Sequence, residues 1–141
     1  NGAFNVSHAA LLVMRRQRDG LIVNVSSMAS QRIGGVSGVA YMTAKHALNA
    51  MNESINHENC HLGIRACALC PGEVATEILE KRPIPVSAED RARMVQEDDV
   101  GRTIRFIAEM PPHVCLNEIH ITPTWNRGYI GAADRAIPRD D

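Results

Sequence analysis

The stretch LIVNVSSMASQRIGGVSGVAYMTAK, residues 21–45, contains the pattern that decides the fold. It begins with a run rich in branched apolar residues, Leu21 to Val25, which is typical of a parallel strand covered on both faces. A serine pair ends this run, and a glycine-rich loop from Ile33 to Gly38 follows. A helical pattern then begins near Ser37 and continues to about His57. We therefore expect a buried strand, a loop and a long helix, in that order.

Helices and strands alternate on both sides of this stretch. The pattern predicts a helix before it and, after it, a second buried strand, a further helix and a third strand. The predicted ranges are Phe4 to Arg18 for the first helix, Ile64 to Leu69 for the second strand, Asp98 or Asp99 to Pro111 for the further helix, and Glu118 to Thr122 for the third strand. Parallel strands joined by right-handed helical crossovers form an α/β doubly wound sheet, which is the fold class we expect.

The chain has the size of one domain, and residues 1–141 are predicted to belong to a single one. Residues 77–97 resemble an inserted lid, because a short amphipathic piece and the breaker run RPIPV precede a helix-capping signature, Ser87 with Asp90. Residues 123–141 have no apolar periodicity and are expected to form a tail on the surface.

Composition excludes several classes of protein. A net charge of −1 without a basic block argues against a nucleic-acid partner. The longest apolar run, Ala9 to Met14, is far too short to span a bilayer, so no membrane partner is expected. Four cysteines without a secretory signal do not suggest a disulfide scaffold. We expect a soluble, cytoplasmic protein.

Two groups of residues have spacings that occur in metal sites, and we expect neither to bind a metal. Cys67 and Cys70 form a CxxC pair, but three-residue spacing in a strand points side chains to opposite faces. His57, Cys60 and His61 lie where a helix ends, without a fourth ligand nearby. The sequence therefore predicts no metal site.

Polar residues follow two of the predicted strands, at the edge where ligands bind in parallel sheets. They are the serines Ser26 and Ser27 and the loop PGEVAT, residues 71–76. Tyr41 and Lys45 are four residues apart, so both side chains can face one cleft from the same helix. A nearby positive charge stabilises a phenolate, and this helps a tyrosine to transfer protons at neutral pH. A serine hydroxyl could donate a hydrogen bond to the carbonyl oxygen of a substrate. Tyrosine could then protonate the same oxygen while the carbonyl carbon accepts hydride.

Less specific interpretations exist for the same residues. Tyr41 and Lys45 could be an ordinary surface pair, and Ser27 could simply cap a helix or turn. Thr76 could cap the first helix of the lid, which is compatible with a ligand contact.

Taken together, these motifs resemble the C-terminal half of the short-chain dehydrogenase/reductase family. The matching segments are IVNVSS, with Ser27 in the catalytic-serine position, YMTAK, CPGEVAT, which is similar to the family's Pro-Gly-x-x-x-Thr loop, and PPHVCLNEIHITP near the last strand. They extend from Phe4 to Pro123. The resemblance implies a Rossmann-like sheet that is incomplete, with only its last three strands and their flanking helices. It also implies reversible hydride transfer between NAD or NADP and a small-molecule alcohol or carbonyl.

The resemblance implies a role for each catalytic residue. Tyr41 would be the general acid and base, and Lys45 would assist it and hydrogen-bond the nicotinamide ribose. Ser27 would orient the substrate oxygen, with Ser26 as the alternative.

The resemblance also implies roles for the PGEVAT loop, for the lid and for the first two helices. Backbone groups of Val74 and the hydroxyl of Thr76 would hold the carboxamide of the nicotinamide, while Pro71 and Gly72 would shape the turn. The lid would close over the substrate. The first helix and the Tyr41 helix would pack against their twins in a homodimer or homotetramer.

One family motif is absent from the sequence. No Gly-x-x-x-Gly-x-Gly fingerprint occurs, so this chain offers no site for the pyrophosphate of a dinucleotide. The family's catalytic asparagine would fall just before Asn1. We therefore expect the N-terminal half of the domain to be missing and the isolated chain to be inactive. The alternative hypothesis is a non-catalytic remnant or an interaction module on the same scaffold.

Overall fold

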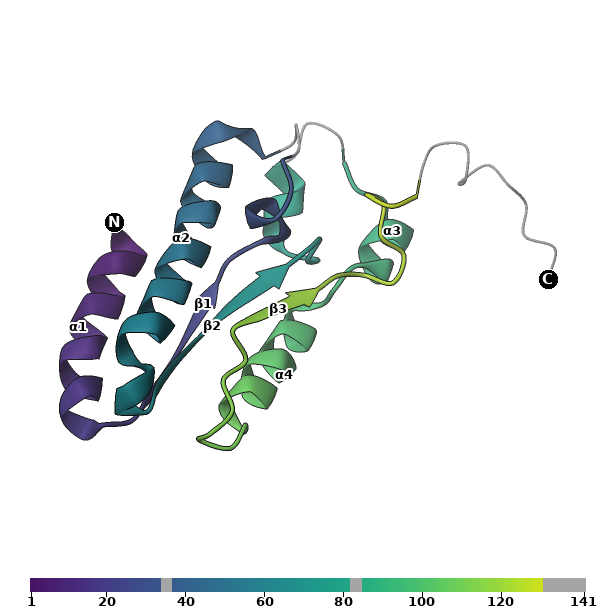
Figure 1. The fold of residues 1–141 in the computed structure, drawn as a ribbon. Helices are drawn as coiled ribbons and strands as arrows, with labels where there is room; N and C mark the ends of the chain where they lie inside the picture. The colour runs from purple at the N-terminus through teal and green to yellow at the C-terminus, as the bar shows by residue number, and fades with distance from the viewer. Residues whose placement is uncertain (34–36, 82–84, 131–141) are drawn as a thin grey trace.

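The computed structural model describes residues 1–33, 37–81 and 85–130 (Figure 1). The main elements follow the predicted order of helix, strand, helix, strand, helix and strand, with η3 and α3 in the segment predicted to be a lid. They are α1 (Gly2–Gln17), β1 (Gly20–Val25), η1 (Met28–Ser30), α2 (Gly38–Asn59), η2 (Cys60–Leu62), β2 (Ile64–Pro71), η3 (Glu77–Lys81), α3 (Ala88–Arg93), α4 (Glu97–Ala108) and β3 (Glu118–Ile121). Parts of the glycine-rich loop, of the RPIPV run and of the tail lie outside the described residues.

The three strands form one parallel sheet in the order β1-β2-β3, which confirms the predicted fold class. Gly20 is opposite Ile64 at the start of the β1–β2 pair, and Pro71 is opposite Ile121 at the end of the β2–β3 pair. Helices α1 and α2 cover one face of the sheet, and α4 covers the other (Figure 1). Because the strands are parallel, the loops that follow β1 and β2 meet at one edge.

Strand β2 lies at the centre of the core. Almost all of its side chains are buried, as expected for a strand with a neighbour on each side and a helix over each face. A cluster of Leu11 from α1, Ile55 from α2, and Ile64 and Ala66 from β2 fills the space between the helices and the sheet. On the opposite face, Ile107 is the buried residue of α4.

The outer helix is less buried than its sequence predicts. The apolar pattern of residues 4–18 requires a covered helix, yet only Ser7 and Leu11 of α1 are buried within this chain. Val6 is 72% exposed, and Phe4 is also largely exposed. That a second copy of the chain covers this face stays a prediction.

Helix α2 contacts the sheet through asparagines as well as apolar residues. Only Ile55 of the predicted apolar stripe is buried. The other members of that stripe are Ala40, Ala44, Ala47, Leu48 and Met51. The other two buried residues of α2 are Asn52 and Asn59. We call Asn49, Asn52, Asn56 and Asn59 the asparagine row, because their spacing of three or four residues places them along one side of the helix.

Asn52 bonds to all three strand regions. Its Oδ1 accepts a hydrogen bond from Asn24 Nδ2 of β1 at 3.0 Å. Its Nδ2 donates to the carbonyl of Ala66 in β2 at 3.3 Å and to that of Asn117, just before β3, at 3.1 Å. One side chain therefore fixes the position of α2 relative to the whole sheet.

Asn56 and Asn59 continue the same role further along the helix. Asn56 forms two hydrogen bonds with the backbone of Ala66, donating to its carbonyl at 2.7 Å and accepting from its amide at 2.6 Å. Asn59 accepts from Arg15 Nε at 2.7 Å and so connects α2 to α1.

We predict that Asn52→Ala lowers the free energy of unfolding by about 2–3 kcal/mol, because it removes the partner of the buried Asn24 amide and one of the donors to the buried Ala66 carbonyl. Chemical denaturation measures this change. Ser54→Ala is the matched control, since its hydroxyl only returns to the carbonyl of Ala50 on the exposed side of α2. A loss no larger than that of the control would contradict the proposed role of Asn52.

Candidate active site

The two serines that follow β1 have different environments. Ser26 is buried, and its hydroxyl donates to the carbonyl of Lys45 at 3.3 Å. Ser27 is partly exposed, and its Oγ accepts a hydrogen bond from the amide of Ala29 at 3.1 Å, which caps η1. The Ser27 hydroxyl can still donate its proton, because the cap uses only a lone pair of the oxygen. The capping interpretation of Ser27 is thus compatible with contact to a ligand.

Tyr41 and Lys45 lie on the first turns of α2, next to the end of β1. The Nζ atom of Lys45 is 5.6 Å from the centroid of the Tyr41 ring and donates to the carbonyl of Val25 at 2.9 Å. Val25 is the last residue of β1, two residues before Ser27. Tyr41 is 45% exposed, so its phenol is accessible. The structure therefore brings the lysine charge, the phenol and the strand end that carries the serines to one region.

The loop after β2 holds a tight turn at the same edge of the sheet. The amide of Gly72 donates to the carbonyl of Ile121 at 2.8 Å. A Cβ at Gly72 would lie 3.2 Å from Cγ2 of Thr122, so a larger residue would crowd the end of β3.

The backbone after Gly72 forms a short parallel bridge between Val74 and Val95. The bridge uses the carbonyl of Glu73, which accepts from Val95 at 3.1 Å, and the amide of Ala75, which donates to Val95 at 2.8 Å. Because backbone groups alternate in direction along an extended chain, the amide of Val74 points away from Val95. The Thr76 carbonyl accepts from Arg91 of α3 at 3.1 Å.

An ion pair that the sequence did not predict connects this loop to the tail. Arg127 makes two hydrogen bonds to the carboxylate of Glu73, at 2.9 and 2.6 Å, and lies 3.6 Å from Asp90 of α3. The bond to Glu73 raises the pKa of the Arg127 guanidinium above its ordinary value. The carboxylate beside the predicted nicotinamide position is therefore neutralised. The sequence gives no signal for this pair, because Arg127 lies 54 positions after Glu73 in a tail without periodicity.

The segment predicted to be a lid has the one helix cap that the sequence predicts. Ser87 Oγ accepts from the amide of Asp90 at 3.0 Å and caps α3. Helix α4 starts at Glu97, slightly earlier than predicted, because Gln96 and Asp99 form a capping box. The amide of Gln96 and the Arg102 side chain hold the pKa of Asp99 below its ordinary value.

The segment predicted to be a lid also borders a hollow in the surface. This hollow, of about 440 Å³, lies between the end of α3, the start of α4 and residues 121–124. Tyr41 and Ser27 are not among the residues that line it.

The two cysteines of the CxxC pair are free thiols in β2, three residues apart. Burial, with Cys115 and Cys70 nearby, raises the pKa of the Cys67 thiol to about 11. Cys67 therefore stays protonated at neutral pH and acts as a small apolar side chain.

Comparison with known proteins decides the family. The short chain dehydrogenase family model matches residues 1–85, which is more than half of the chain. The chain belongs to the short-chain dehydrogenase family. The predicted resemblance is therefore confirmed. The relatives described next are dehydrogenases and reductases, which supports the predicted enzyme class at the level of the family.

Individual relatives agree with this assignment. Dehydrogenase/reductase SDR family member 11 from Mus musculus is 28% identical over 139 residues, covering 86% of this chain and 54% of its own. A β-ketoacyl-[ACP] reductase (FabG) structure from Bacteroides thetaiotaomicron is 31% identical with a TM-score of 0.70, covering 86% of this chain and 49% of its own. The closed form of serine dehydrogenase complexed with NADP⁺ has a TM-score of 0.75 at 19% identity, covering 95% of this chain and 54% of its own. The last likeness shows the shared fold.

This short-chain dehydrogenase chain spans about half the length of the relatives it matches. Within the described residues, no helix combines the length and apolarity needed to cross a bilayer.

We predict that Glu73 and Arg127 couple by about 1–2 kcal/mol, because the pair is bidentate and only about a quarter exposed. A double-mutant cycle of Glu73→Gln and Arg127→Gln, followed by denaturation, measures the coupling. Arg105 and Glu109, an exposed pair on α4, form the control cycle, for which we expect at most about 0.5 kcal/mol. Equal coupling in the two cycles would contradict a special role for Arg127.

Proposed function

We propose that the complete protein containing this chain is an NAD(P)-dependent oxidoreductase that interconverts an alcohol and a carbonyl, with Tyr41 as general acid and base. The observation that supports this most is the position of Lys45 Nζ, which lies 5.6 Å from the centroid of the Tyr41 ring and bonds to the backbone at the end of β1. Membership of an oxidoreductase family supports the reaction class.

Each residue has a separate task in the proposed reaction. Ser27 donates a hydrogen bond to the substrate oxygen and fixes its position. In the reductive direction, the Tyr41 hydroxyl gives its proton to that oxygen, and the positive charge of Lys45 stabilises the phenolate that remains. In the oxidative direction, the phenolate removes the proton of the alcohol.

The loop after β2 fits the carboxamide end of a nicotinamide. A carboxamide needs both a donor and an acceptor, and the outward amide of Val74 and the hydroxyl of Thr76 are of these types. Pro71 and Gly72 set the turn that presents them. The bound dinucleotide would supply or accept the hydride. NADP⁺ in a structure of the same fold supports this class of cofactor, while the choice between NAD and NADP stays open.

We predict that Tyr41→Phe lowers kcat by at least about 100-fold, since it removes the group that transfers the proton. NADPH affinity, measured by fluorescence titration of the complete enzyme, should change far less. Tyr129→Phe is the matched control, because Tyr129 is an exposed tyrosine that stacks with Arg32. Turnover in Tyr41→Phe comparable to that of the control would refute the acid and base role.

A second experiment separates this function from that of a non-catalytic remnant or interaction module. The complete protein should quench or enhance NADPH fluorescence on binding, whereas the 141-residue chain should bind NADPH weakly, because it has no glycine fingerprint for the pyrophosphate. Absence of NADPH binding by the complete protein would favour the non-catalytic alternative.

A further inference from the structure

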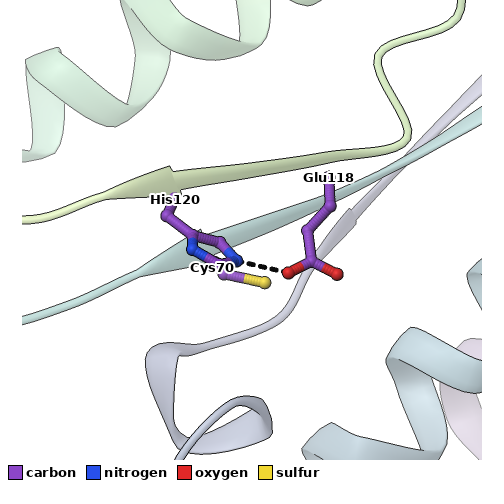
Figure 2. A group of neighbouring side chains, drawn as sticks. All are labelled: Cys70, Glu118 and His120. Carbon is purple, nitrogen blue, oxygen red and sulfur yellow. Dashed lines mark hydrogen bonds and ion pairs between the residues drawn. The ribbon is translucent and has the colours of Figure 1, made fainter.

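Three side chains of metal-ligand type converge at the β2–β3 pair, on the face that α2 covers. They are Cys70 of β2 and Glu118 and His120 of β3 (Figure 2). Cys70 is directly opposite His120 in the strand register, and Glu118 lies two residues earlier on β3, so all three point to the same face. Their nearest sulfur, nitrogen and oxygen atoms all lie within 4.8 Å of one another.

The donor set suits a zinc-type ion. Thiolate, imidazole and carboxylate are the three ligand types that Zn²⁺ uses, at bond lengths of about 2.0–2.3 Å. Tetrahedral bonds of that length place donor atoms about 3.5 Å apart, so a small rotation of side chains closes the site. Cys70 is fully buried and fixed, whereas His120 and Glu118 have partly exposed side chains that can rotate. In this structure, which contains no ion, His120 Nε2 bonds to the Glu118 carboxylate (Figure 2).

Side-chain amide groups form hydrogen bonds to two of the three potential metal ligands. Asn49 Nδ2, from the asparagine row, is 3.6 Å from the sulfur of Cys70 and 3.3 Å from Oε2 of Glu118. Gln31 Nε2 donates to the other oxygen of Glu118. Hydrogen bonds of this kind orient metal ligands. Two anionic donors would also match the charge of a divalent cation.

We propose that Cys70, Glu118 and His120 bind a divalent transition-metal ion such as Zn²⁺, with water completing the coordination. The ion would cross-link β2 and β3. It would also lie close to the turn of Ser27, because Ser30 Oγ is 3.7 Å from the sulfur of Cys70 and donates to the Ser27 carbonyl at 2.6 Å. The site does not depend on the oxidoreductase function proposed above.

Sequence reasoning missed this group because it considered cysteines and histidines that are close along the chain. A signal was present, since Glu-x-His in a strand places both side chains on one face. The register with β2 was the missing information.

Titration of the reduced, complete protein with Co²⁺ tests the site. We expect one ion per chain, with a thiolate-to-cobalt charge-transfer band in the near ultraviolet and the intense visible bands of a tetrahedral site. Zn²⁺ should displace Co²⁺ and raise Tm. Cys70→Ser should abolish the charge-transfer band, and His120→Gln and Glu118→Gln should each weaken Co²⁺ binding by at least tenfold.

Matched variants control for other thiols and imidazoles. Cys115→Ser and His46→Gln should leave the cobalt spectrum and affinity unchanged, because neither residue belongs to the group. His120→Gln and Glu118→Gln alter partly exposed side chains, so they test the site even if Cys70→Ser fails to fold. A spectrum without the charge-transfer band, or a band that survives in Cys70→Ser, would overturn the proposal. Unchanged Co²⁺ affinity in both His120→Gln and Glu118→Gln would overturn it as well.

Discussion

The hydrogen bonds between the asparagine row and the sheet are the constraint on which the site depends. Tyr41 and Lys45 lie near the start of α2, and Asn52 begins to fix that helix two turns later. Because a helix is rigid over this length, fixing its rotation at Asn52 and Asn56 also fixes the direction of the residues before them. Apolar contacts alone would permit small rotations, since they have no preferred direction. Asparagine amides require particular carbonyls, and they therefore select one orientation.

The other half of the site depends on charge compensation. The loop that follows β2 carries Glu73 at the place where a cofactor is proposed to bind. Arg127 neutralises that carboxylate and, through Asp90, extends the contact to α3. The tail segment therefore takes part in the electrostatics of the loop, although its sequence has no regular pattern. This loop is held by hydrogen bonds, and its carboxylate charge is compensated by Arg127. Both features favour the presentation of its backbone amides to a polar ligand.

Much of the fold could be predicted from the sequence because the strands have a strong compositional signal. A branched apolar run ended by two serines predicted β1, and an apolar run stopped by Pro71 and Gly72 predicted β2. The serine and Pro-Gly loops then had to meet at one edge. The burial of α2 was harder, because hydropathy treats asparagine as a surface residue. Asn52 is buried where it bonds to the carbonyls of Ala66 in β2 and of Asn117 just before β3, which are distant from it in sequence. The same limit applies to Arg127 and to the group around Cys70.

The bridge between Val74 and Val95 joins two chain positions that are 21 residues apart. It holds together the two ends of the intervening segment, of which residues 75–81 and 85–94 are described. The entropy of closing such a loop depends only weakly on its length, and insertions inside it cost little stability. Substitutions there can change what the segment covers while the ends of β1 and β2 keep their separation. The length and sequence of this segment could therefore vary while the three-stranded sheet stays the same.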